Sequence, residues 1–329
     1  MSAPPRPTPA FVEEFRAAAD SLAVAVAGSD LGLRIASCPG WTAYDLVVHL
    51  GNVHGWAATI VETGERAAEQ DDEPPSPRPK AVGSWYGAKA EDLYQVLRTT
   101  PSDRPCWNFV EHRGVAGFWP RRQLHETTMH RVDLDLASGR TPLLDSDVAA
   151  DGVGEVLGIL VHRMHARGHR TALVEPLALS ATDTGDTWVM VPQPGPPLLE
   201  RFAGAVDVRD RVEAPADVLY RLLWQRPVDT GSVRVTGDPA HVQAFLSSRL
   251  APDDCAGIVV VQVHEIGAVP GPNAPVVVLV RGIGAVPGQD APVVVQVHEI
   301  LTCRFVGGRG SARATPGGTD GVRRPGRGR

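Results

Sequence analysis

The feature that most constrains this chain is the run of residues 121–133, RRQLHETTMHRVD. No Gly or Pro interrupts it, and Pro120 precedes it, which suits the first turn of a helix. Gly139 marks the expected end. We therefore predict a helix from about Trp119 to Ser138.

Two side chains of this helix, Glu126 and His130, are placed to share one metal ion. They are four positions apart, so at about 100° per residue they lie on one helical face. His125 and His130 are five apart and point about 140° away from each other, so they cannot both reach that ion. The zinc-protease pattern H-E-x-x-H is therefore excluded, because it needs its two histidines four apart. The Glu/His pair needs a third ligand, and the alternative is a hydrogen-bonded histidine beside a solvated glutamate.

The N-terminal region predicts two helices. Apolar residues recur every three or four positions over 9–27, as in an amphipathic helix. A second helix should begin after Thr42, which with Asp45 comes close to a capping box. His49 lies on the apolar face of that helix, where a bundle would supply a third ligand, although a hydrogen-bonded core histidine is the alternative. His54 is expected at the rim.

Further helices are expected at 84–98 and 147–167, with the acidic, proline-rich stretch 69–79 interpreted as a solvated loop for which no packing role is required. Four or five helices joined by short and medium loops favour a helical bundle.

A rival metal site is formed by His162, His165 and His169, which fall on one face of the helix expected at 147–167. Arginines interleave with them, no carboxylate accompanies them, and Gly168 is expected to end the helix. We interpret this group as a solvated basic face.

A smaller second domain is expected after the bundle. Residues 177–182 and 188–191 alternate apolar and polar, as half-buried strands do, and a helix at 214–224 and a strand at 232–236 follow. This pattern predicts a small α+β domain, and a cleft between two domains is a common ligand site. Arg226 is our candidate there for contact with an anionic group of the substrate or thiol, with a surface arginine at a helix end as the alternative.

The charge of the chain is unevenly distributed. The formal net charge is −6, but residues 301–329 carry about +6 and the first 300 residues about −12. A body this acidic argues against specific nucleic-acid binding. The four cysteines form no C-x-x-C pair, and neither a signal region nor an apolar run of about 18 residues is present, so a cytoplasmic protein without membrane contact is expected.

A repeat of 17 residues begins near residue 259, with start points at 259, 276 and 293. Each unit has a valine-rich run followed by a Gly- or Pro-containing turn, which favours a repetitive β arrangement, although a recent DNA expansion or a shifted reading frame is the alternative. Residues 301–329 are rich in Gly and Arg and are expected to be disordered. The predicted division is thus 1–170, 171–250, 251–300 and 301–329.

Several motifs together carry a specific resemblance. They are CPGWT at 38–42, HLG at 49–51, FWPRRQ at 118–123 and HET at 125–127, followed by HRVD at 130–133. With them the chain resembles, over about residues 9–249, the mycothiol-dependent maleylpyruvate isomerase family of the DinB/YfiT-like metalloenzyme superfamily. The resemblance implies an N-terminal four-helix bundle that holds a divalent metal, usually zinc, through His49, Glu126 and His130, and a small α+β C-terminal domain.

The resemblance also implies chemistry: a metalloenzyme that uses mycothiol, a low-molecular-weight thiol, on a small electrophile, as in thiol-assisted cis–trans isomerisation. One alternative is a mycothiol S-transferase with a detoxifying role at the same site, and another is a non-catalytic metal-binding or regulatory protein. The chain has neither a G-x-S-x-G elbow nor a glycine-rich phosphate loop, so serine hydrolases and nucleotide enzymes are poorly supported.

Overall fold

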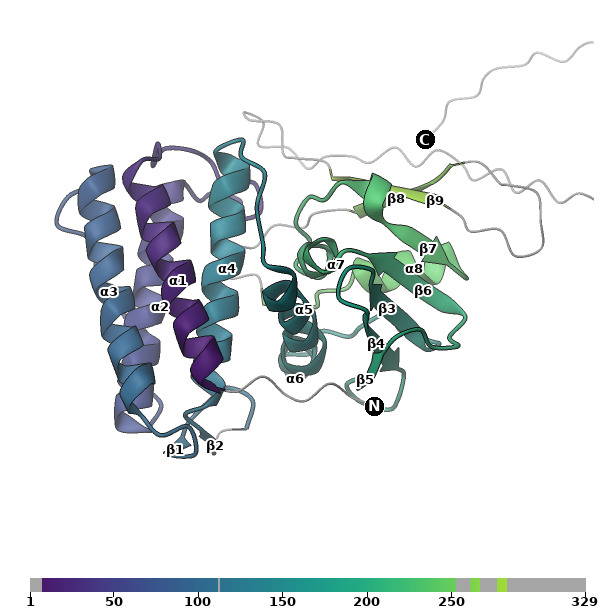
Figure 1. Ribbon diagram of the computed structural model, residues 1–329, viewed down its shortest axis with the longest axis horizontal. Helices are drawn as coiled ribbons and strands as arrows, with labels where there is room; N and C mark the ends of the chain where they lie inside the picture. Colours follow the sequence, from purple (N-terminus) through teal and green to yellow (C-terminus); the bar gives the residue numbers. More distant parts are fainter. Residues whose placement is uncertain (1–7, 112, 253–260, 267–276, 283–329) are drawn as a thin grey trace, which may run out of the picture. The chain divides into compact units, whose positions relative to one another are not determined.

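The computed structural model describes residues 8–111, 113–252, 261–266 and 277–282 (Figure 1). Its N-terminal part consists of four long helices: α1 (Thr8–Ala27), α2 (Ala43–Thr63), α3 (Pro79–Thr99) and α4 (Phe118–Ala137). The short strands β1 (Pro105–Cys106) and β2 (Gly114–Val115) pair in the segment between α3 and α4. None of the described helices is both long and apolar enough to cross a membrane. The predicted helical bundle is confirmed.

The four helices bury one continuous core, in which the largest side chains include Phe15, Leu50, Tyr86 and Trp119. Thr42 caps α2 as the sequence indicated: its Oγ accepts from the backbone NH of Asp45, and the Asp45 carboxylate accepts from the backbone NH of Thr42 at 2.8 Å. Helix α3 begins five residues earlier than expected, because Pro79 is accommodated in its first turn.

The stretch predicted to be a solvated loop is fastened to the bundle. Asn52 on α2 forms a reciprocal pair with the backbone of Asp72, donating to its carbonyl at 3.0 Å and accepting from its NH at 2.9 Å. Within the same stretch, Lys89 on α3 donates to Gln70 at 3.0 Å, and just before it Trp56 on α2 donates to the carbonyl of Ala67 at 3.1 Å. The stretch therefore packs against the bundle, which the sequence did not indicate, because the anchoring groups are single polar side chains that no periodicity marks.

The helix expected at 147–167 is present as α5 (Ser146–Glu155), a π-helical turn (Val156–Leu160) and α6 (Val161–Ala166), and Gly168 follows in the left-handed conformation. Its buried side chains pack in a second core together with those of the sheet. The domain boundary at residue 170 stays a prediction. The apolar face of α5 nevertheless packs with the sheet, whose strands all follow residue 170.

The second core is built on a five-stranded sheet of order β5-β4-β3-β6-β7, in which β3 and β6 are parallel and the other neighbours antiparallel. The strands are β3 (Leu177–Ala181), β4 (Asp186–Val191), β5 (Leu198–Ala203), β6 (Asp210–Ala214) and β7 (Arg234–Thr236). Helices α7 (Ala216–Leu223) and α8 (Pro239–Leu246) complete this part, together with a 3-10 turn (Thr230–Ser232). The mixed fold class is therefore confirmed, although β5, β6 and α8 were not anticipated.

Parts of the first two 17-residue repeats form strands β8 (Val261–Ile266) and β9 (Val277–Gly282), which pair antiparallel. The third repeat and the stretch 301–329, for which disorder was predicted, lie outside the described residues.

Candidate metal centre

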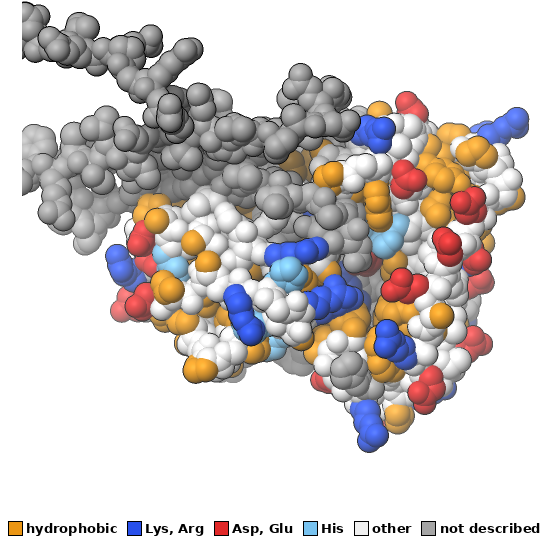
Figure 2. Space-filling model, turned by 180° about the vertical axis from the view of Figure 1, so that it is seen from behind, with side chains coloured by type: hydrophobic (Ala, Val, Ile, Leu, Met, Phe, Trp, Pro, Cys, Tyr) orange, Lys and Arg blue, Asp and Glu red, His pale blue; other side chains and the backbone are white. Residues whose placement is uncertain are grey.

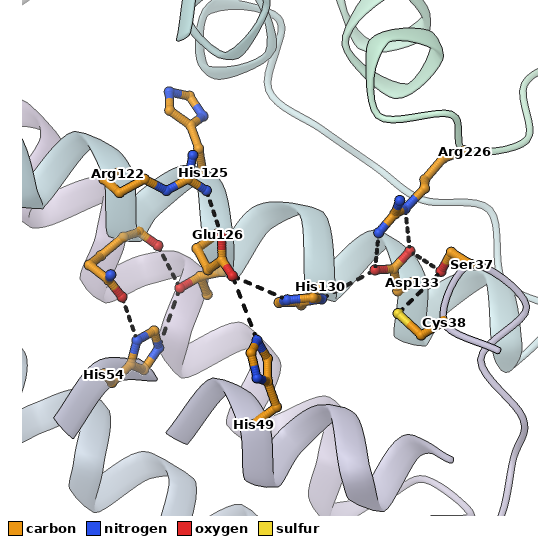
Figure 3. A network of polar contacts seen from close by, with 12 residues as sticks. Ser37, Cys38, His49, His54, Arg122, His125, Glu126, His130, Asp133 and Arg226 are labelled. Carbon is orange, nitrogen blue, oxygen red and sulfur yellow. Dashed lines mark hydrogen bonds and ion pairs between the residues drawn. The ribbon is translucent and has the colours of Figure 1, made fainter. Parts of the chain in front are cut away.

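Three side chains from two helices converge at one point of the bundle. His49 comes from α2, and Glu126 and His130 come from α4 (Figure 3). Each offers one ligand atom, and these atoms all lie within 4.8 Å of one another. Glu126 Oε1 is 3.4 Å from His130 Nε2 and 3.9 Å from His49 Nε2. In the part of the chain that the structure describes, this is the only such group of three or more.

His49 has one ring nitrogen whose hydrogen-bonding capacity is not satisfied. Its Nε2 is buried and forms no hydrogen bond, which is costly for a polar atom removed from water. The ring lies against Trp41, with ring centroids 4.9 Å apart. Two imidazole nitrogens and one carboxylate oxygen are a donor set that suits a divalent ion such as zinc, so these residues fit a metal.

His130 is held in place by a carboxylate behind it. Its Nδ1 lies 3.2 Å from Asp133 Oδ2, and because the carboxylate only accepts, Nδ1–H donates and Nε2 faces the other ligand atoms. Burial would lower the pKa of His130, but Asp133 and then Glu126 outweigh it and raise that pKa to about 9. A cation bound at Nε2 must therefore compete with a proton.

Arg226, a candidate for contact with an anionic group of a ligand, is buried against Asp133. Its Nε and Nη2 donate to the two carboxylate oxygens at 2.8 and 3.0 Å, and Nη1 donates to the carbonyl of Trp224 at 2.8 Å. Ser37 donates to the same carboxylate at 2.7 Å. Arg226 thus holds the carboxylate that lies behind His130, a contact that no spacing in the sequence could indicate.

The second oxygen of Glu126 has a different partner. Arg122, one helical turn earlier, donates from Nη2 to Glu126 Oε2 at 2.6 Å and from Nη1 to Glu155 Oε2 at 2.5 Å. Burial would raise the pKa of Glu126, but Arg122, followed by His130 and His49, holds that pKa well below its usual value. Glu126 is consequently an ionised carboxylate, as a metal ligand must be.

A pocket of about 320 Å³ reaches this group of residues. Aromatic side chains form much of its wall, and polar and charged groups complete it. The lining includes Trp41, His49, Asn52, Trp56, Glu69, Gln70, Phe109, Trp119, Arg122, Glu126, Arg163 and Arg167. His49 and Glu126 therefore have a side that faces space large enough for a small molecule.

The other histidines lie elsewhere. His125 does not line the pocket; its side chain points in a different direction from that of Glu126, and its Nε2 lies 2.8 Å from Asp151 Oδ2 (Figure 3). His54, expected at the rim, is fully buried between helices, with Nδ1 2.8 Å from Gln123 Oε1 and Nε2 3.2 Å from the Tyr86 hydroxyl. The prediction of a rim position was wrong, because α4 covers His54 on the side of Gln123 and α3 covers it on the side of Tyr86.

The rival histidine cluster is not assembled as a metal site among the described residues. His162 Nε2 lies 3.2 Å from the carbonyl of Pro197, and burial, followed by Arg170 and His162, lowers the pKa of His165. On the face in Figure 2, basic side chains form small groups among acidic and hydrophobic ones rather than a continuous stripe.

The sequence analysis did not identify Asp133 and Arg122 as functional residues, although their spacing from His130 and Glu126 could have indicated them. Asp133 follows His130 by three positions and Arg122 precedes Glu126 by four, so each lies on the same helical face as its partner.

Comparison with known proteins gives one family match. Residues 12–135 match the family model described as the mycothiol maleylpyruvate isomerase N-terminal domain, a segment that contains His49, Glu126 and His130. A crystal structure of the mycothiol-dependent maleylpyruvate isomerase aligns with 70% of this chain and 93% of its own, at a TM-score of 0.48 and 14% identity. A histidine-to-alanine mutant of that isomerase aligns over the same shares at 0.49 and 12%. No curated protein matches this chain significantly in sequence.

Proposed function

We propose that this chain, which through residues 12–135 belongs to the mycothiol maleylpyruvate isomerase family, is a metal-dependent enzyme that uses mycothiol to transform a small electrophile. The observation that carries the proposal is the convergence of His49, Glu126 and His130 inside the matched segment, beside a pocket.

Each of the three residues has a distinct task. His49 and His130 would supply neutral nitrogen ligands, and Glu126 would supply one anionic oxygen. Asp133 holds the His130 ring in the orientation that presents Nε2, and Trp41 packs on the ring of His49. A bound divalent ion would supply Lewis acidity and favour the thiolate form of a thiol in the pocket.

The pocket suits a reaction between a thiol and a small conjugated electrophile. Its walls combine aromatic rings, which exclude water from an apolar body, with the Arg163 and Arg167 side chains, whose positive charge suits an anionic group. In an isomerisation the thiol sulfur adds to a cis carbon–carbon double bond conjugated with a carbonyl, the resulting single bond rotates, and the thiol leaves to give the trans product. The thiol is regenerated, so atoms and electrons balance.

The proposal is tested by elemental analysis and thiol titration. Purified protein should carry about one divalent ion per chain, and His130→Ala should lose most of it, whereas His162→Ala should not. Calorimetric titration with mycothiol should show binding to the metal-loaded protein and much weaker binding after chelation. Full metal content in His130→Ala would refute the ligand assignment.

The product separates the two enzymatic alternatives. An isomerase releases the thiol unchanged, whereas an S-transferase leaves it covalently attached to the product, which mass spectrometry of the reaction mixture distinguishes. A protein that carries the ion but neither binds the thiol nor turns over any electrophile would be a metal-binding or regulatory protein instead.

A further inference from the structure

One proposed ligand, Glu126, forms a cluster of three buried charges with its neighbours Arg122 and Glu155. The side chains of Arg122, Glu126 and Glu155 are 5%, 14% and 1% exposed, and one guanidinium is shared between two carboxylates. Removing such charges from water is expensive, and a well-packed apolar set of the same volume is often as stable or more stable. Their cost calls for an explanation other than stability.

We infer that Arg122 and Glu155 are positioning residues for Glu126: they fix which of its oxygens faces His49 and His130, and they set the charge beside the ion. This inference rests on the proposed function. Neither residue needs to touch substrate for this role, because both act through Glu126.

The geometry of the Arg122 guanidinium supports the first part of this inference, that the orientation of the Glu126 carboxylate is fixed. Its planar fork places one Nη on Glu126 Oε2 at 2.6 Å and the other on Glu155 Oε2 at 2.5 Å, so the orientation of the fork is fixed at both ends. The Trp224 ring lies 5.8 Å from the same guanidinium and restricts it further. With Oε2 occupied, Oε1 is the oxygen that remains for the two Nε2 atoms. Glu126 is thereby prepared to bind an ion through one oxygen, which leaves positions on the ion open.

The charge of Glu155 supports the second part of the inference, that these residues set the charge beside the ion. Arg122 alone would neutralise Glu126 and repel a cation, but Glu155 offsets that positive charge from the far side of the fork. The cluster of Arg122, Glu126 and Glu155 therefore keeps a formal charge of −1. Glu155 is the last residue of α5, directly before the π-helical turn Val156–Leu160, and such turns are frequent at functional sites.

If Arg122 and Glu155 had a purely structural role, it would be to join α4 to α5. The neighbouring pair of Arg121 and Asp151 already joins these two helices. Arg121 donates to Asp151 on α5 from Nε to Oδ2 at 2.6 Å and from Nη2 to the carbonyl at 2.9 Å. It joins the same two helices but makes no contact with Glu126. Asp151→Asn is therefore a matched control for Glu155→Gln, and Arg121→Lys for Arg122→Lys.

The experiment measures metal affinity by competition with a chromophoric chelator, the absorption spectrum of the cobalt-loaded protein, and the thermal midpoint without metal. Replacement of a group behind a metal ligand typically weakens metal binding about 10- to 100-fold. We expect Glu155→Gln to weaken cobalt and zinc binding about tenfold or more, and Arg122→Lys to change the cobalt spectrum, because an ammonium group lacks the two-pronged fork. The control variants should lower the thermal midpoint yet keep metal affinity within about twofold and the spectrum unchanged.

Wild-type affinity and spectrum in both Glu155→Gln and Arg122→Lys would overturn the inference while leaving the proposed metal site intact. Equal weakening by Asp151→Asn would overturn it too, since a general loosening between α4 and α5 would then explain the effect. Wild-type protein that takes up no ion would overturn the proposed function, and this inference with it.

Discussion

Replacement of His54 tests the buried polar network of the bundle independently of any metal. The side chain is fully buried, and burial lowers its pKa to about 4 in spite of the hydrogen bond with Gln123. In the unfolded chain the ordinary value of 6.5 applies. Between these two values the unfolded state binds a proton that the folded state does not, so the free energy of unfolding falls as the pH is lowered.

The magnitude follows from the difference between the two pKa values. One pKa unit corresponds to about 1.4 kcal/mol, so His54 should cost the folded protein about 3 kcal/mol by pH 4 and almost nothing above pH 7. This is a large share of the 5–15 kcal/mol that roughly spans the stability of native domains. Acid should therefore unfold the wild-type protein more readily than its carboxylates alone would dictate.

The assay is urea unfolding followed by tryptophan fluorescence, with chelator present, from pH 4 to pH 8. His54→Asn keeps a donor for Gln123 but has no group that titrates in this range. It leaves the Tyr86 hydroxyl without its imidazole partner, which lowers stability by a similar amount at every pH. We expect the variant to lose about 3 kcal/mol less than wild type between pH 7 and pH 4. His169→Asn, outside both buried cores, should retain the wild-type slope. Parallel curves for wild type and His54→Asn would refute the reasoning.

Three further outcomes are expected. Glu126→Gln should weaken metal binding at least about tenfold, whereas His125→Ala should lower the thermal midpoint but keep the ion. Metal titration of the two variants measures this difference. The reverse result would require a different phase of helix α4. Asn52→Ala should detach the segment around Asp72 and weaken thiol binding several-fold without changing metal content, as measured by calorimetry and elemental analysis; unchanged thiol binding would mean that this segment is not part of the functional pocket. A chain ending at Pro252 should keep its metal content and thermal midpoint, and loss of soluble expression would contradict the predicted boundary near residue 250.

Helical periodicity accounts for most of what the sequence predicted correctly. The phase of α4 follows from 3.6 residues per turn, so the shared face of Glu126 and His130 and the different direction of His125 needed no tertiary information. The capping box at Thr42 and the left-handed Gly168 that follows α6 are likewise local features.

What the sequence did not predict depends on contacts between distant segments. The Asp133–Arg226 pair joins residues 93 positions apart, and the His54–Gln123 pair joins residues 69 apart. Whether α5 packs with the bundle or with the sheet depends on which apolar faces meet, and both faces satisfy the same periodic pattern. Strand β5 was missed because its half-exposed side chains show little apolar alternation.

The convergence of Ser37, His130 and Arg226 on the carboxylate of Asp133 has a consequence for protein engineering. Arg226 follows α7, so the bundle alone lacks the main counter-charge of a buried anion. A bundle excised after α4 should therefore fold poorly unless Asp133 is also neutralised, for example by Asp133→Asn. For the same reason, a chimera that joins this bundle to a foreign second domain must supply an arginine at the equivalent place.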